Sequence, residues 1–167
     1  MSEKEKSKQK KIMLNLGSGD KKLSGYINVD SREECNPDLV CDIRKLPYKE
    51  NTVDRILVSD ALEHVGRTEV KTVLEQWYSI LKPNGLFIIK TPNIDTLIDF
   101  YKAKKIPFEE LVRKIFGNQD YSGNYHYVGF NPENIKQLLT SVGFKVINLT
   151  EQMTGGDWSN MAVRCRK

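Results

Sequence analysis

Residues 12–19 read Ile-Met-Leu-Asn-Leu-Gly-Ser-Gly, and they give the first indication of the fold. A short apolar run that stops at glycines is typical of a buried parallel strand entering a tight turn. Glycines at such a turn let the backbone approach a ligand closely and adopt positive φ at little steric cost. Taken alone, Gly17 and Gly19 fit a structural turn as well as they fit a ligand-binding loop.

Working outward from this turn, apolar runs and helical periodicity alternate along the chain. Apolar residues at 70, 73, 74, 77 and 81 follow one face of an amphipathic helix, and further helical stretches are expected at 94–104 and 107–116. A last helix is expected with Asn131 as its N-cap and Pro132 as its first residue, and it should end before Gly143. Further strands are expected at 26–30, 39–43, 53–59, 86–90, 144–149 and 161–165. This order predicts an α/β fold with a mostly parallel sheet and helices on both faces, and ligands bind such sheets beyond the carboxyl ends of the strands.

Acidic residues close the second and third expected strands. Asp30 follows Gly19 by 11 residues, and a carboxylate there can accept hydrogen bonds from a ribose diol. Asp42 lies 12 residues further on, where it could accept from the amine of adenine while Ile43 packs on the ring. Each acid alone fits a solvated turn, but three strand ends in register along one sheet edge favour a nucleoside site.

The short spacing after Gly19 favours a nucleoside ligand over a dinucleotide. An NAD fingerprint needs a third glycine that opens a helix and an acid about 20 residues later. Here Asp20-Lys21-Lys22 follows Gly19, and only three residues remain before Tyr26. There is hardly room for the helix whose N-terminus would hold a pyrophosphate, and no Gly-Lys-Ser/Thr phosphate loop occurs. We therefore expect a ligand with an adenosine and no phosphate.

These motifs in order resemble a class I S-adenosylmethionine-dependent methyltransferase, in particular the compact methyltransferase type 11-like group. The resemblance covers residues 12–149 and rests on six stretches: Asn-Leu-Gly-Ser-Gly (15–19), Gly-Tyr-Ile-Asn-Val-Asp (25–30), Asp-Ile-Arg-Lys-Leu-Pro-Tyr (42–48), Val-Asp-Arg-Ile-Leu-Val-Ser-Asp-Ala-Leu-Glu-His-Val (53–65), Leu-Lys-Pro-Asn-Gly (81–85) and Thr-Pro-Asn (91–93). It implies a Rossmann-like seven-stranded sheet in the order 3-2-1-4-5-7-6 with the last strand antiparallel. It also implies S-adenosylmethionine as cofactor and S-adenosylhomocysteine as product.

The resemblance assigns the cofactor site residue by residue. Gly17, Ser18 and Gly19 are expected against the methionine part, and Ser59 at its border. Asp30 is expected to hold the ribose hydroxyls, and Asp42 and Ile43 to contact adenine. Asn15 replaces the acid frequent at this position, so only its amide oxygen could accept a bond from the amino group.

Methyl transfer chiefly requires alignment of nucleophile and methyl group and exclusion of water, and a general base helps when the acceptor is a hydroxyl. The sequence holds two histidines, His64 after the fourth strand and His126 in the polar, aromatic segment 117–131. Both are candidate catalytic residues, although each fits a purely structural role as well. We expect segment 117–131 to be a lid or substrate loop, with Tyr121, Tyr125 and Tyr127 as candidate acceptor-lining residues.

Charge, cysteine content and apolar runs indicate the domain organisation and location of the protein. The net charge of +4 is concentrated in residues 2–11, with five lysines and two glutamates, so the remaining chain is nearly neutral. We expect residues 1–11 to be a disordered charged tail and residues 12–167 to be one methyltransferase domain. Three cysteines without a CxxC pair argue against a disulfide framework and a zinc knuckle, so no metal is expected. No membrane-spanning run or secretory signal occurs, which makes the cytoplasm the default location.

The sequence therefore predicts a methyltransferase that acts on a small molecule, such as a sugar or nucleotide-sugar hydroxyl. Nucleic acid is disfavoured as acceptor, because Ser59-Asp60-Ala61-Leu62 replaces the Asp/Asn-Pro-Pro-aromatic run of adenine amino methyltransferases and no Pro-Cys dipeptide occurs. A binding module that keeps the adenosyl pocket without turnover stays open as an alternative. A nicotinamide-dependent oxidoreductase is a third hypothesis, which the missing glycine and the short spacing disfavour. The acceptor and the oligomeric state are not fixed by the sequence.

Overall fold

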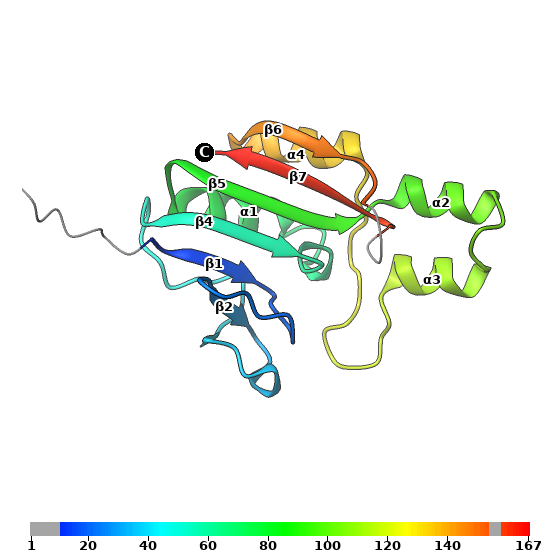
Figure 1. Ribbon diagram of the computed structural model, residues 1–167, viewed down its shortest axis with the longest axis horizontal. Helices are drawn as coiled ribbons and strands as arrows, with labels where there is room; N and C mark the ends of the chain where they lie inside the picture. The colour runs from blue at the N-terminus through cyan, green and yellow to red at the C-terminus, as the bar shows by residue number, and fades with distance from the viewer. Residues whose placement is uncertain (1–10, 154–157) are drawn as a thin grey trace, which may run out of the picture.

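Seven strands form one sheet in the computed structural model, which describes residues 11–153 and 158–167 (Figure 1). The strands are β1 (Met13–Leu16), β2 (Ile27–Asp30), β3 (Leu39–Val40), β4 (Val53–Ser59), β5 (Leu81–Pro92), β6 (Lys145–Thr150) and β7 (Asn160–Arg166). The helices are α1 (Val70–Ile80), α2 (Ile94–Lys102), α3 (Phe108–Phe116) and α4 (Pro132–Val142), with short 3-10 turns η1 (Glu33–Cys35) and η2 (Leu62–His64). The expected N-terminal tail lies, except for Lys11, outside the described residues.

The strand order is β3-β2-β1-β4-β5-β7-β6, which confirms the order predicted from the resemblance. The pairs among β1 to β5 are parallel, and β7 runs antiparallel to both β5 and β6. Strand order reverses between β1 and β4, each of which leads into a different half of the sheet. In open sheets of this kind the crevice beyond the carboxyl ends at that reversal is where ligands bind.

Two strands differ by three residues or more in length from the sequence prediction. β3 ends at Val40 instead of residue 43, because the chain turns at Asp42, whose carbonyl accepts a hydrogen bond from the Lys45 N–H at 2.9 Å. β5 is longer than the expected 86–90, and its pairing with β4 shifts register between Val53 and Arg55. Within the bounds of β5, Asn84 takes a left-handed conformation with φ of 62°.

The helices cover the sheet less evenly than predicted. Both α1 and α4 pack on the same face and against each other (Figure 1). On that face the paired row Val58–Ile89–Val163 is fully buried, whereas the neighbouring row Leu57–Ile88–Arg164, which points to the other face, is only partly buried or exposed. The links between β1, β2 and β3 hold no α-helix, only the 3-10 turn η1, and among the described residues no α-helix covers that second face.

The main core lies between the sheet and the pair α1/α4. Phe87 of β5 stacks on Phe144 at 4.7 Å between ring centroids and lies 6.1 Å from Trp77 of α1. All three rings are at most 2% exposed. Burying aromatic side chains of this size contributes much of the stability of a small domain.

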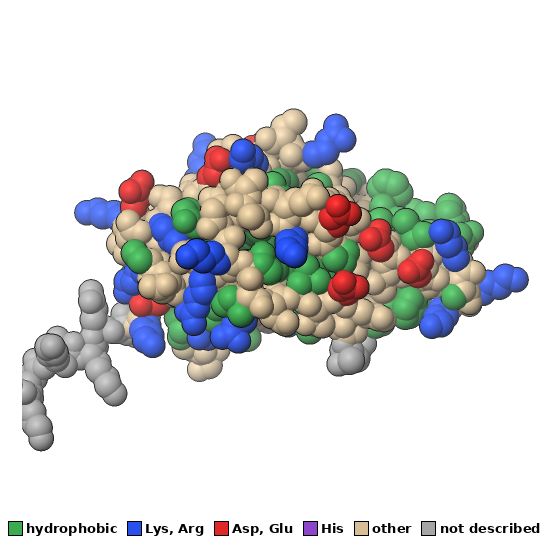
Figure 2. Space-filling model, turned by 90° about the horizontal axis from the view of Figure 1, so that it is seen from above, with side chains coloured by type: hydrophobic (Ala, Val, Ile, Leu, Met, Phe, Trp, Pro, Cys, Tyr) green, Lys and Arg blue, Asp and Glu red, His purple; other side chains and the backbone are tan. Residues whose placement is uncertain are grey.

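Helices α2 and α3 form a hairpin beyond the carboxyl end of β5, with a small core of their own around Leu97, Ile106 and Leu111. Hydrophobic side chains gather at this end of the molecule (Figure 2). In α4 the predicted punctuation is confirmed: Asn131 and Asn134 form a reciprocal capping box, and Gly143 takes a left-handed conformation. None of the described helices combines the length and apolar character needed to cross a bilayer.

Candidate active site

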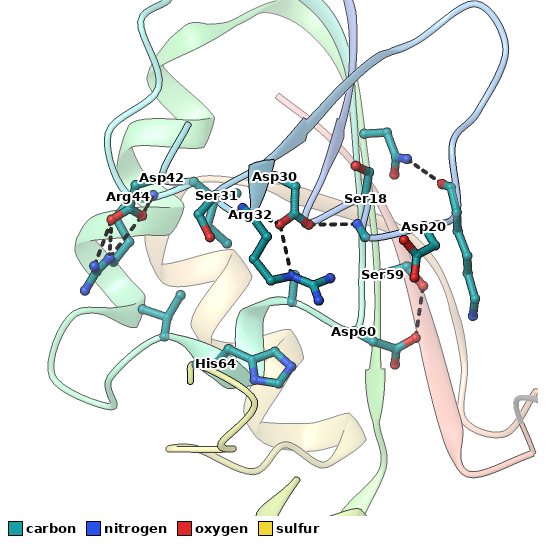
Figure 3. Close-up of a pocket in the computed structure, with 18 of the residues that line it drawn as sticks. Ser18, Asp20, Asp30, Ser31, Arg32, Asp42, Arg44, Ser59, Asp60 and His64 are labelled. Carbon is teal, nitrogen blue, oxygen red and sulfur yellow. Dashed lines mark hydrogen bonds and ion pairs between the residues drawn. The ribbon is translucent and has the colours of Figure 1, made fainter. Parts of the chain in front are cut away.

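A cavity of about 740 Å³ opens beyond the carboxyl ends of β1, β2 and β4 (Figure 3). All eight residues that the sequence predicts for cofactor contact line it: Asn15, Gly17, Ser18, Gly19, Asp30, Asp42, Ile43 and Ser59. The sheet brings them together from four separate chain segments. The prediction of where a ligand would bind therefore agrees with the location of the cavity.

The glycine turn forms one wall of the cavity. Gly17 has φ of 64°, and a Cβ placed on it would collide with the Cβ of Ala61, which follows β4. Gly19 also has positive φ, at 48°. The Ser18 N–H donates to the Val29 carbonyl at 3.0 Å, which ties the turn to β2. The turn therefore needs glycine at position 17 for both its conformation and its close packing.

Asp30 ties the end of β2 to this turn. Its Oδ2 accepts from the Gly19 N–H at 2.7 Å, and its Oδ1 accepts from the Arg32 N–H at 2.9 Å (Figure 3). The residue is 6% exposed and borders the cavity. Each carboxylate oxygen can accept two hydrogen bonds, so Asp30 keeps acceptor capacity for a ligand diol.

Asn15 is part of a buried amide network under the cavity. Its Nδ2 donates to the Lys21 carbonyl at 3.1 Å and to Asn28 Oδ1 at 2.9 Å, and Asn28 in turn donates to Asp38. These bonds hold the loop between β1 and β2, and they lower the pKa of Asp38 through the bonds that it accepts from Asn28. With both amide hydrogens used, the amide oxygen of Asn15 is the group left for a ligand.

Asp42 and Ile43 form the far wall of the cavity. Asp42 is paired with Arg44 at 2.8 Å, and this hydrogen-bonded pair lowers the pKa of the Asp42 carboxyl (Figure 3). The Ile43 carbonyl accepts from Trp77 Nε1 at 2.9 Å, which anchors this wall to α1. Arg44 also borders the cavity, and the sequence analysis did not single it out.

The segment after β4 supplies further lining residues. Asp60 has φ of 52°, and its Oδ1 accepts from Asn160 Nδ2 at 2.6 Å, while Ser59 Oγ donates to its Oδ2 at 3.3 Å. His64, at the end of η2, reaches the cavity from below in Figure 3. Burial lowers the pKa of His64, against the opposing effect of the Tyr125 carbonyl. A neutral imidazole at this position can accept a proton.

Segment 117–131 borders the opening of the cavity, and two of its predicted residues, Tyr121 and Tyr127, line it. The guanidinium of Arg32 lies 4.4 Å from the Tyr121 ring centre and its Nε lies 3.4 Å from Asp30 Oδ1, so Arg32 joins the segment to the end of β2. Sequence reasoning missed Arg32, because nothing in the local pattern shows that a tyrosine 89 positions later packs on it.

Tyr125 and His126 are not among the residues that line the cavity. The Tyr125 carbonyl contacts His64 Nδ1 at 3.0 Å, and the Tyr127 N–H donates to the Glu63 carbonyl at 2.8 Å, which fastens the segment to η2. The His126 ring packs edge-on against His64, with 4.8 Å between ring centroids. His126 therefore lies behind His64 as seen from the cavity.

Glu63 is a further residue that the sequence analysis left out. It is 2% exposed, and its Oε2 accepts from Thr91 Oγ1 at 3.1 Å. Burial, reinforced by nearby Asp60, raises the pKa of Glu63 to about 8. The sequence carries no signal for this, since a glutamate at a helix start is ordinarily solvated.

The cavity suits an adenosine ligand with an amino-acid tail. Ser18 Oγ borders it and is buried without a hydrogen-bond partner in the described part of the chain, which leaves it available to a ligand. Asp30 can accept a further hydrogen bond. Position 17 has no room for a side chain, because a Cβ there would collide with Ala61. A mostly parallel sheet with a cavity at its switch point is the arrangement in which Rossmann-like folds bind nucleotide ligands.

Comparison with known proteins gives the class. Residues 21–89 match the family model described as a methyltransferase domain. The chain is 26% identical over 121 residues to the demethylmenaquinone methyltransferase of Oceanobacillus iheyensis, covering 67% of this chain and 49% of that protein. The chain thus spans about half the length of this curated relative.

Solved structures show the same fold. A methyltransferase from Methanosarcina mazei described as S-adenosylmethionine-dependent superposes with a TM-score of 0.67 at 16% identity, covering 95% of this chain and 93% of that one. One from Archaeoglobus fulgidus superposes with a TM-score of 0.65 at 15% identity, covering 94% and 86%. Together with the family match over residues 21–89, these findings show that the chain is similar to class I S-adenosylmethionine-dependent methyltransferases and shares their fold.

Proposed function

We propose that the protein transfers the methyl group of S-adenosylmethionine to an oxygen of a small molecule. The observation that carries the proposal is the convergence of the Gly17 turn, Asp30 and Asp42 on one cavity whose opening is bordered by His64. When bound, the cofactor supplies an electrophilic methyl group on a sulfonium. The protein's own contribution is to orient the two reactants and to exclude water.

Each wall of the cavity has a proposed role in holding the cofactor. Asp30 accepts hydrogen bonds from the ribose hydroxyls, and Asp42 and Ile43 contact the adenine. Asn15, through its amide oxygen, and Ser18, through its unpartnered hydroxyl, contact the methionine part beside Gly17 and Gly19. Ser59 borders the same part at the end of β4.

The acceptor is proposed to bind between the end of β4 and segment 117–131. His64 there is positioned to accept the hydroxyl proton, with His126 packed behind it. Tyr121 and Tyr127 line the same opening, and rings of this kind pack well on the apolar faces of sugars. A sugar or nucleotide-sugar hydroxyl is the acceptor class that we propose, with nucleic acid disfavoured.

We further propose that residues 12–167 form one methyltransferase domain in which segment 117–131 acts as a lid. A cytoplasmic location is part of the same proposal, and the free state of Cys35, Cys41 and Cys165 is consistent with it.

The test is transfer of a labelled methyl group from S-adenosylmethionine into the small-molecule fraction of a cell extract. The expected result is label in a small-molecule product with the unmodified protein, and none with Asp30→Ala. Cofactor binding without label in any fraction would favour the alternative, a binding module without turnover. Label confined to nucleic acid or protein would contradict the proposed acceptor class.

A further inference from the structure

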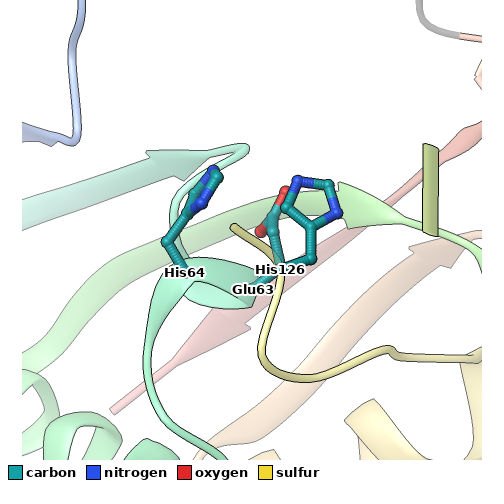
Figure 4. Close-up of side chains that lie close together, drawn as sticks. All are labelled: Glu63, His64 and His126. Carbon is teal, nitrogen blue, oxygen red and sulfur yellow. The ribbon is translucent and has the colours of Figure 1, made fainter. Parts of the chain in front are cut away.

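Three potential metal-ligating side chains meet behind the cavity. One ligand atom each of Glu63, His64 and His126 lie within 4.8 Å of one another. Figure 4 shows Glu63 and His64 coming from η2 and His126 from segment 117–131. The two segments are far apart in sequence, so the cluster exists only because Tyr125 and Tyr127 fasten the segment to η2.

Both imidazoles are oriented by a backbone carbonyl. His64 Nδ1 lies 3.0 Å from the Tyr125 carbonyl oxygen, and His126 Nδ1 lies 3.1 Å from the Lys114 carbonyl oxygen. A carbonyl oxygen only accepts, so Nδ1 carries the proton in each ring and Nε2 keeps the lone pair. Histidines that bind metals are typically held in this way, with the second ring nitrogen donating to a carbonyl or carboxylate.

The carboxyl of Glu63 has an unused oxygen. Oε2 accepts from Thr91, but Oε1 is buried and has no hydrogen-bond partner among the described residues. Leaving a buried polar atom unsatisfied costs about 1–3 kcal/mol. The fold therefore holds a carboxyl oxygen in the interior, next to two imidazoles, with no hydrogen-bond partner from residues 11–153 or 158–167.

We propose that Glu63, His64 and His126 bind one divalent first-row transition-metal ion. Two imidazoles and one carboxylate suit such ions, and three protein ligands leave positions open for an exogenous oxygen. Ligand atoms around a bound zinc ion stand about 3.4 Å apart, so small side-chain rotations close the present cluster around an ion. The ligand set differs from the sequence expectation, which was that no metal is bound.

The location gives the ion a role that rests on the proposed function. His64 alone of the three borders the cavity, so the open side of the ion faces the proposed acceptor position. A divalent ion there would bind the acceptor hydroxyl oxygen and lower its pKa, so that the proton leaves to solvent water; the oxygen then takes the methyl group, and S-adenosylhomocysteine is the leaving group. The ion thus takes over the activating role that is otherwise assigned to His64 as a base.

The experiment uses the full chain, freed of metal with a chelator that is then removed. Co²⁺ is titrated by its visible absorption and Zn²⁺ by calorimetry. We expect one ion per chain. Glu63→Gln and His126→Asn are expected to weaken Zn²⁺ binding by about 10- to 100-fold or more, and the exposed Glu109→Gln is the matched control.

S-adenosylhomocysteine binding is measured on the same samples, so the two proposals fail separately. Absence of Co²⁺ and Zn²⁺ binding at about 1 mM ion, with S-adenosylhomocysteine binding intact, overturns the metal site and leaves the proposed function standing. Ion binding that Glu63→Gln and His126→Asn both leave unchanged also overturns it, since the ion then lies elsewhere. Ion binding without S-adenosylhomocysteine binding contradicts the proposed function instead.

Discussion

The Cα of Gly17 faces the Cβ of Ala61 so closely that a methyl group on Gly17 would occupy the same space. This contact presses the turn after β1 against the chain that leaves β4. Because these are the two strands at which the sheet order reverses, the contact fixes the position of one cavity wall relative to the other.

Gly17→Ala is expected to destabilise the protein by two separable effects. The left-handed conformation costs a residue with a Cβ about 1–2 kcal/mol, and the collision with Ala61 adds about 1–3 kcal/mol. In the background of Ala61→Gly only the first cost should remain. Denaturant unfolding of the four proteins measures this difference, and equal destabilisation by Gly17→Ala in both backgrounds would show that the contact with Ala61 is unimportant.

Asp30→Ala is expected to abolish the thermal stabilisation by S-adenosylhomocysteine. A ligand at about 100 times its Kd stabilises the wild type by about 2.7 kcal/mol, which corresponds to a rise in Tm of about 5–10 °C for a domain of this size. Asp99→Ala, an exposed change on α2, is the control and should keep the full shift. A full shift in Asp30→Ala would remove Asp30 from the cofactor site.

The raised pKa of Glu63 predicts a pH-dependent stability. Between its ordinary value of 4.5 and about 8, the folded protein binds more protons than the unfolded chain. The stability that Glu63 contributes is thus fully present below pH 4.5 and is lost as the pH rises towards about 8. Relative to Glu63→Gln, the free energy of unfolding of the metal-free wild type should fall by on the order of 4 kcal/mol between pH 4.5 and about 8.

Urea unfolding of both proteins at several pH values, with chelator present, measures this loss. The two histidines are common to both proteins, so their own titration largely cancels in the difference. A difference in unfolding free energy that stays constant with pH would mean that Glu63 is already ionised in the folded protein.

Arg32 and Tyr121 are expected to act together on the cofactor. A cation–π contact at a partly exposed site contributes about 0.5–1 kcal/mol, so a double-mutant cycle of Arg32→Ala and Tyr121→Ala should show a coupling of that size. Each variant should also weaken S-adenosylhomocysteine binding. The Lys105–Phe100 contact, at 4.7 Å in the α2–α3 hairpin, is the control pair, and its loss should leave that affinity unchanged. Additive effects of the first pair would argue against a closed lid.

The parts of the fold that local patterns specify could be predicted from the sequence. The apolar runs at β1 and β4, the period of α1 and the punctuation of α4 each follow from neighbouring residues. The strand order came from the resemblance, and it is confirmed. The absence of helical cover on the Leu57–Ile88–Arg164 row could have been anticipated, since the same short spacing after Gly19 that disfavours a dinucleotide also leaves no room for a helix.

Site residues near the ends of strands could be predicted from the sequence. Site residues whose environment depends on tertiary contacts could not. Asp30 ends β2 and Asp42 follows the end of β3 by two residues, so the sheet brings both to one edge. Glu63 lacks any such marker, because its burial depends on Thr91 and on the segment that carries His126. Arg32 is similar, since only the folded chain brings Tyr121 onto it.

The most direct test is a calorimetric titration of the full chain with S-adenosylhomocysteine, with NADH titrated in parallel. We expect saturable binding of one S-adenosylhomocysteine per chain and no binding of NADH, because the turn after β1 offers a nucleoside site without a helix N-terminus for a pyrophosphate. Absence of S-adenosylhomocysteine binding at about 1 mM, or binding of NADH in its place, would contradict the assignment of this cavity to S-adenosylmethionine.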